Sequence, residues 1–273
     1  MIRKDFTAIP ITPYGGIMSS TISEGRSAAT AVIVRDMPDG PPQLLMMERA
    51  GSMAFAAGAL VFPGGALDEA DWELAEAIGG ADQLDERASR IAAIRETLEE
   101  SGLALGFSSP VDQLQSLEMR EALLRGANLS AILTDNGLRL KLDELVPFTR
   151  WHPAGAEMAR RIYDTRFYLV RAPQGQEARV DATENVRLLW KSAQDTINLC
   201  DAGEGRIIFP TRRNLERLAQ FDSFEAMVAH AGSFPVEKVQ PWVEERGGES
   251  HLCIPDHLGY PITSEPMGRV QRG

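Results

Sequence analysis

The chain has 273 residues, of which 44% are hydrophobic and 25% are charged, a composition typical of a globular protein large enough to bury a full core. Its 28 basic and 39 acidic residues give a net charge of −11, which repels nucleic acid and anionic membrane surfaces alike, so neither partner is expected. Cys200 and Cys253 are the only cysteines, and neither a run of 18 apolar residues nor an N-terminal leader pattern is present. We therefore expect a cytoplasmic protein without disulfides.

The start of the chain predicts an irregular arm followed by strands. Residues 1–26 are rich in Ser, Gly and Pro and are expected to form the arm. The β-branched run in residues 28–36 predicts a central strand, and residues 43–50 predict a second strand that pairs with it antiparallel across a short turn. A loop and a short strand then lead to Gly64 and Gly65, where the backbone can approach a ligand closely.

The most informative segment is RETLEESGL, residues 95–103, within a helix expected from about Asp85 to Ser101. Helical spacing places Glu96, Glu99 and Glu100 on one stripe of this helix. Three neighbouring carboxylates repel one another unless a cation lies among them, and hard oxygen ligands suit Mg²⁺ or Mn²⁺. These ions usually complete their coordination with substrate phosphates, so the segment indicates phosphate chemistry. A solvated surface helix is the alternative, and acidic residues alone would favour it.

Together with VFPGG, residues 61–65, this segment resembles the Nudix box, G-x5-E-x7-R-E-U-x-E-E-x-G-U with U apolar. Thr97 stands where an apolar residue is expected. Gly65 and Arg95 are 30 positions apart, whereas the box separates these residues by 14, so about 16 residues are inserted. The isolated Glu of the box therefore has two candidates and no assignment: Asp71 is the sixth residue after Gly65, and Glu86 lies near the expected distance before Arg95.

The remaining chain predicts further helices and strands. Residues 68–83, within the insert, can hold a short helix, and residues 111–136 turn helical again over a segment longer than a minimal Nudix fold needs, which suggests a lid or a dimer surface. Strands are predicted in residues 142–153, 164–172 and 186–190, helices from residue 193 and in 210–221 and 223–232, and a hairpin around residues 247–248.

The resemblance implies an α/β/α sandwich with a mixed sheet, to which helical insertions and a C-terminal extension are added. We divide the chain into an irregular N-terminal arm (1–26), a Nudix hydrolase domain (27–232) and a C-terminal extension (233–273) that forms a hairpin and a tail. The Nudix domain contains the helical insertion at about residues 111–137. By analogy with other Nudix proteins, a homodimer is the expected assembly.

The resemblance also assigns roles at the site. It implies divalent-metal-dependent hydrolysis of a diphosphate linkage with Mg²⁺ or Mn²⁺, in which Glu96, Glu99 and Glu100 are metal ligands. Arg95 would hold a carboxylate in position, and Gly64 and Gly65 would let the backbone lie near the metals. Glu184 precedes the strand that carries Trp190, a position where Nudix enzymes often have a further metal ligand or base; an ordinary surface acid is the alternative. The general base remains open between Glu184 and the box carboxylates.

The order of motifs resembles the Nudix branch that includes the mammalian peroxisomal coenzyme A diphosphatase. This resemblance implies hydrolysis of coenzyme A or acyl-CoA to 3′,5′-ADP and phosphopantetheine or its acyl form. The arginines available for a 3′-phosphate are Arg160, Arg161, Arg166, Arg212 and Arg213. The alternatives are the same chemistry on ADP-ribose, a dinucleotide or a nucleotide sugar, and a Nudix-fold module that senses a nucleotide without turnover. In each case the partner is a small nucleotide-diphosphate molecule.

Overall fold

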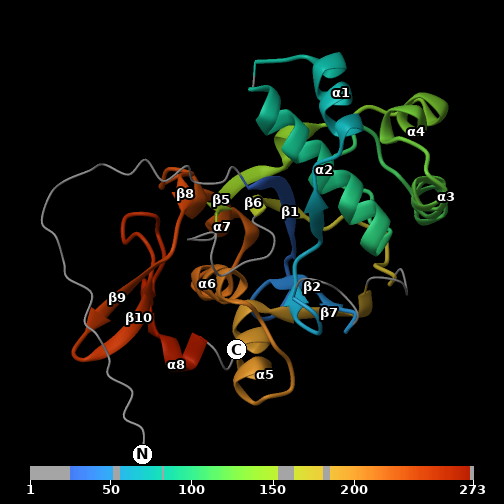
Figure 1. The fold of residues 1–273 in the computed structure, drawn as a ribbon. Coiled ribbons are helices and arrows are strands. Elements are labelled where there is room, and N and C mark those ends of the chain that lie inside the picture. The colour runs from blue at the N-terminus through green and yellow to red at the C-terminus, as the bar shows by residue number, and fades with distance from the viewer. Residues whose placement is uncertain (1–24, 52–55, 82, 153–162, 181–184, 271–273) are drawn as a thin grey trace, which may run out of the picture.

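The structure is a computed structural model that describes residues 25–51, 56–81, 83–152, 163–180 and 185–270 (Figure 1). A mixed sheet of eight strands forms its centre, in the order β3-β2-β1-β6-β5-β8, with β4 paired to β1 and β7 paired to β2. The strands of this sheet are β1 (Arg26–Arg35), β2 (Gln43–Arg49), β3 (Leu60–Val61), β4 (Gly64–Ala66), β5 (Val146–Trp151), β6 (Tyr163–Arg171), β7 (Asn185–Ser192) and β8 (Lys238–Val239).

Strand β1 is the central strand that its apolar run predicts. Its residues from Ala28 to Val34 are buried, and it pairs in parallel with β6 along almost its whole length. The predicted antiparallel pairing with β2 is present but short, because it covers only the last two residues, Val34 and Arg35. Earlier along the strand, β4 pairs with β1 from Ala28 to Thr30 and occupies the edge that β2 would need. Strand β2 instead pairs with β7 over its full length.

Helices cover both faces of the sheet, as an α/β/α sandwich requires (Figure 1). The helices on the first face are α1 (Glu69–Ile78), α2 (Leu84–Ser101), α3 (Gln113–Leu124) and α4 (Leu129–Asn136); those on the second are α5 (Ala193–Asp201), α6 (Phe209–Leu218) and α7 (Phe224–Ala231). A short 3₁₀ helix, η1 (Leu142–Glu144), precedes β5. The predicted helix in the insert is α1, and the helical segment after the box consists of the two helices α3 and α4.

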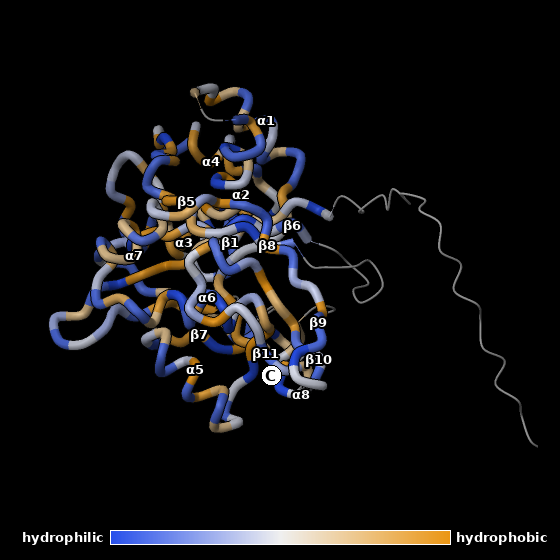
Figure 2. Tube along the Cα trace, turned by 90° about the vertical axis from the view of Figure 1, so that its left-hand side faces the viewer, coloured by the Kyte–Doolittle hydropathy of each residue, from blue (hydrophilic) through white to orange (hydrophobic). Residues whose placement is uncertain are grey.

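Alternation along β1 divides the hydrophobic core into two clusters. Ala31 and Ile33 pack with α2, α3 and α4, whereas Val32 and Val34 pack with α5, α6 and α7, as the two-residue period of a strand dictates. In Figure 2 hydrophobic stretches run through the middle of the body, where the sheet lies, and hydrophilic stretches predominate at its outer turns. None of the helices in the described part of the chain combines the length and apolar composition that a membrane crossing requires.

The C-terminal segment forms a second, three-stranded sheet of β9 (Trp242–Arg246), β10 (Glu249–Cys253) and β11 (Ser264–Pro266), followed by α8 (Met267–Val270). Strands β9 and β10 pair antiparallel across the two glycines where the sequence predicts a hairpin. Tyr260 joins this segment to the main body: its hydroxyl lies 2.7 Å from Thr149 Oγ1, accepts a hydrogen bond from Trp151 Nε1 at 2.9 Å and donates to Asn214 Oδ1 at 3.0 Å. The segment therefore contributes to the core beneath α6.

Candidate active site

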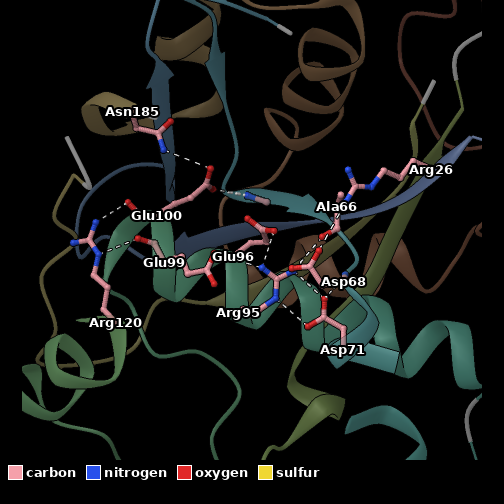
Figure 3. Close-up of polar contacts among 11 residues, drawn as sticks. Arg26, Ala66, Asp68, Asp71, Arg95, Glu96, Glu99, Glu100, Arg120 and Asn185 are labelled. Atoms are coloured by element: carbon pink, nitrogen blue, oxygen red, sulfur yellow. Dashed lines mark hydrogen bonds and ion pairs between the residues drawn. The ribbon is translucent and has the colours of Figure 1, made fainter. Parts of the chain in front are cut away.

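Helix α2 directs two of the predicted carboxylates, Glu96 and Glu100, toward β4, and the third, Glu99, extends from the same helix beside them (Figure 3). Its apolar stripe, which includes Ile91, Ile94 and Leu98, is fully buried under β1. Burial of that stripe sets the rotation of the helix, so the acidic stripe must face the segment that carries Gly64 and Gly65. The helix ends at Gly102, whose φ of 73° stops the α-helical backbone.

Glu100 is the most enclosed of the three carboxylates, with 5% of the residue exposed. The backbone N–H of Gly64 donates to its Oε2 at 2.8 Å, and Nδ2 of Asn185, at the start of β7, lies 3.5 Å from its Oε1. Burial raises the pKa of Glu100 to about 8, and the nearby charge of Glu96 acts in the same direction. The hydrogen bonds and the charge of Arg49 oppose this shift without cancelling it.

Arg95 lies at the centre of the acidic cluster and is itself buried (Figure 3). Its Nε and Nη2 donate to the two carboxylate oxygens of Asp71 at 3.0 and 2.9 Å, and Nη2 also donates to the carbonyl of Ala66 at 3.0 Å. Its Nη1 donates to Glu96 at 2.9 Å and to Glu99 at 3.4 Å. Burial alone would lower the pKa of Arg95, but these carboxylates outweigh it and raise the pKa. The guanidinium therefore stays charged and fixes three carboxylates at once.

Asp71 is the residue that the sequence reasoning left unassigned. It belongs to α1, is 1% exposed, and also accepts a hydrogen bond from the backbone N–H of Asp68 at 2.9 Å. The other candidate, Glu86, lies nearer the start of α2 and pairs with Arg90 and Arg166. Of the two acids, Asp71 is thus the one that contacts the box arginine, whereas spacing in the sequence left both as candidates.

The remaining two carboxylates carry negative charge that Arg95 compensates only in part. Burial raises the pKa of Glu96 to about 7, although the charge of Arg95 works against the shift. Burial likewise raises the pKa of Glu99, again against the effect of Arg95. Because Arg95 is shared among Asp71, Glu96 and Glu99, a further positive charge near these carboxylates would favour their charged forms.

The residues present fit a divalent cation. In the part of the chain that the structure describes, no three His, Cys, Asp or Glu side chains already stand close enough to hold a metal ion. The donor chemistry is nevertheless suitable, because Glu96, Glu99 and Glu100 supply carboxylate oxygens, which are the donors that Mg²⁺ and Mn²⁺ prefer. The backbone of Gly65 approaches so closely that an added Cβ would lie 2.4 Å from the carboxyl carbon of Glu96. Gly64 has a φ of 154°, and a Cβ there would lie 2.3 Å from the carbonyl oxygen of Ala29. The Gly pair is therefore required for backbone to reach the carboxylates.

The remaining predicted site residues are Glu184 and the five arginines considered for a 3′-phosphate. Glu184, Arg160 and Arg161 fall outside the described residues; Asn185, directly after Glu184, contacts Glu100. The three other arginines proposed for a 3′-phosphate are engaged in ion pairs, as follows: Arg166 with Asp85 and Glu86, Arg212 with Asp201 and Glu216, and Arg213 with Glu216 and Glu265.

An α/β/α sandwich of this kind is also the fold of solved Nudix hydrolases, a class of enzymes that act on phosphorus anhydrides and generally need divalent metal ions. No protein-family model matches the chain. The crystal structure of a Nudix hydrolase from Alicyclobacillus acidocaldarius is 29% identical to it, with a TM-score of 0.66, and the match covers 76% of this chain and 97% of that one. The chain thus has the α/β Nudix fold, and this similarity supports its place in the Nudix family.

Two further solved structures match with lower scores. An Ap4A hydrolase binary complex from C. elegans is 17% identical with a TM-score of 0.38, over 75% of this chain and 98% of that one. The Nudix domain of Shewanella oneidensis NrtR, complexed with ADP ribose, is 13% identical with a TM-score of 0.40, over 72% of this chain and 86% of that one. At these scores neither structure informs the substrate of this protein.

Proposed function

We propose that this chain hydrolyses the diphosphate linkage of coenzyme A or acyl-CoA with Mg²⁺ or Mn²⁺, giving 3′,5′-ADP and phosphopantetheine or its acyl form. One observation carries the reaction class: α2 holds Glu96 and Glu100 beside the close-approaching backbone of Gly64 and Gly65, and Glu99 extends from the same end of the helix. Burial raises the pKa of each of these carboxylates, and a bound divalent cation would favour their charged forms. The Nudix fold supports hydrolysis of a nucleoside diphosphate derivative.

The residues of the site have distinct roles in this proposal. When bound, a divalent ion supplies charge neutralisation of the diphosphate and a more acidic attacking water. Glu96, Glu99 and Glu100 would hold it, together with Glu184. Arg95 holds the side chains of Glu96 and Glu99 in place, and is itself held by Asp71.

Proton transfer from the attacking water needs a carboxylate that is ionised at the working pH. The candidates are Glu99, Glu100 and Glu184. Of the two that the structure describes, Glu100 has the more defined geometry, since the N–H of Gly64 and the amide of Asn185 constrain its two oxygens.

The choice of coenzyme A rests on the order of sequence motifs. A panel of coenzyme A, acyl-CoA, ADP-ribose, a dinucleotide and a nucleotide sugar, each with Mg²⁺ and with Mn²⁺, tests it when products are identified by mass. We expect 3′,5′-ADP from coenzyme A at the highest kcat/KM. A higher kcat/KM for ADP-ribose, a dinucleotide or a nucleotide sugar would reject coenzyme A as the substrate but leave the proposed diphosphate hydrolysis unchanged. No turnover on the whole panel, together with tight binding of one compound, would instead favour a nucleotide-sensing module.

We further propose that the protein acts in the cytoplasm as a homodimer on this small-molecule substrate. The monomer mass is 29.9 kDa, so light scattering distinguishes a dimer of twice that mass from a monomer. Elution as a monomer at all accessible concentrations would reject the dimer without affecting the proposed reaction.

A further inference from the structure

The C-terminal end of α2 carries two of the proposed metal ligands, Glu99 and Glu100. The backbone carbonyls of a helix's last turn have no hydrogen-bond donor within the helix. The N–H of Gly102 donates to the carbonyl of Leu98 at 3.0 Å, and the N–H of Arg179 donates to the carbonyl of Ser101 at 2.7 Å. The carbonyls of Glu99 and Glu100 lie between those of Leu98 and Ser101, and each needs a hydrogen-bond donor from another element.

Arg120, on α3, supplies that donor (Figure 3). Its Nε donates to the carbonyl of Glu99 at 2.9 Å, and its Nη2 donates to the carbonyl of Glu100 at 3.3 Å. The residue is buried, with 7% exposed, so water cannot readily replace these hydrogen bonds. Its positive charge also lies at the negative end of the helix dipole, where a cation is stabilising.

We propose that Arg120 is a positioning residue for the metal site: by holding the carbonyls of Glu99 and Glu100, it fixes the backbone from which both carboxylates extend. The inference rests on the proposed function, since it assumes that these carboxylates bind the metal. It also gives the inserted helix α3 a role in the reaction, because the helix delivers a side chain to the end of the catalytic helix.

The geometry favours arginine at this position. Two N–H groups on one edge of a planar guanidinium reach two successive carbonyls, whereas the single ammonium of a lysine is a point donor on a flexible stem. A shift of the carboxylates by about 1 Å can cost on the order of 10²-fold in rate, so a small backbone displacement is enough to matter.

The test compares Arg120→Lys and Arg120→Ala with Arg125→Ala. Arg125 follows the same helix, but its side chain is 70% exposed and pairs with Glu121, so it serves as the matched control. Mn²⁺ binding is measured without substrate by the electron paramagnetic resonance of free Mn²⁺, and kcat and KM are measured at saturating Mn²⁺. Thermal unfolding of each metal-free variant identifies the temperature range in which it is folded.

We expect Arg120→Ala to weaken Mn²⁺ binding about tenfold, the lower end of what loss of a group supporting metal ligands costs. We expect its kcat to fall by a similar factor with KM little changed, Arg120→Lys to be intermediate, and Arg125→Ala to match the wild type. If Arg120→Lys and Arg120→Ala, measured well below their unfolding temperatures, bind Mn²⁺ and turn over like the wild type, Arg120 only stabilises the fold and the inference is wrong. If Arg120→Ala does not fold, the Mn²⁺ affinity and kcat of Arg120→Lys alone test the inference. A wild type that binds no Mn²⁺ would instead overturn the proposed function.

Discussion

The buried pair of Asp71 and Arg95 allows a quantitative test of the site. We predict that Asp71→Asn destabilises the metal-free protein by about 3 kcal/mol. Removing one partner of a buried ion pair costs about 3–5 kcal/mol, and this pair has 1% and 8% of its side chains exposed, with two hydrogen bonds of 2.9 and 3.0 Å. The lower end of this energy range applies because Arg95 keeps its contacts with Glu96 and Glu99.

Asp68→Asn is the control for this prediction. Asp68 lies 3.6 Å from the same guanidinium, but 57% of its side chain is exposed, and exposed ion pairs contribute about 0–1 kcal/mol. Asn also remains able to cap α1, which begins at the next residue. Urea unfolding followed by circular dichroism gives the free energy of unfolding and its slope for each variant. If Asp71→Asn loses less than about 1 kcal/mol, like Asp68→Asn, the pair does not anchor Arg95 and the reasoning fails.

Three further predictions follow from the same contacts. Glu100→Gln should lower kcat at least 10²-fold if Glu100 binds the metal, as measured by steady-state hydrolysis at saturating Mn²⁺; wild-type turnover would contradict its role. Gly65→Ala places a methyl group 2.4 Å from the carboxyl carbon of Glu96, so that carboxylate must move. Mn²⁺ binding measured by calorimetry should therefore weaken about tenfold. Unchanged affinity would show that the close approach of the residue 65 backbone to Glu96 is not needed for metal binding. Burial would raise the pKa of Asp164, but hydrogen bonds from Arg150 and Lys238 prevail and hold the pKa at about 2, below its ordinary value of 3.8. The charged carboxylate therefore stabilises the folded protein fully above pH 3.8, and this stabilisation is lost as the pH falls toward 2. The advantage of wild type over Asp164→Asn in urea midpoint should therefore shrink between pH 5 and pH 2.5, and a constant difference would contradict the assignment.

Sequence patterns predicted those parts of the fold that depend on local periodicity. The helix expected from about Asp85 to Ser101 is α2, Leu84–Ser101, because its apolar stripe and its closing Gly102 are both local signals. The same stripe set which side of the helix carries the acids, and the resemblance to the Nudix box gave the expectation that the Gly pair lies near them, as Glu96 and Glu100 show.

Contacts between distant segments could not be predicted in this way. Asp71 meets Arg95 only because α1 packs on α2 across the insert, and neither its spacing nor its charge distinguished it from Glu86 before the structure. Arg120 likewise acts through backbone carbonyls, which leave no trace in the pattern of side chains. The short pairing of β1 with β2 follows from competition with β4 for one strand edge, a question that only the assembled sheet decides.

The central claim is that α2 gathers carboxylates that bind a divalent metal ion. Crystals of the protein soaked in Mn²⁺ test it most directly, because anomalous scattering locates the ion independently of any substrate. The account predicts a peak at about 2.1 Å from carboxylate oxygens of at least two among Glu96, Glu99 and Glu100. Saturating Mn²⁺ with no peak near α2, or with a peak only at other residues, would contradict it.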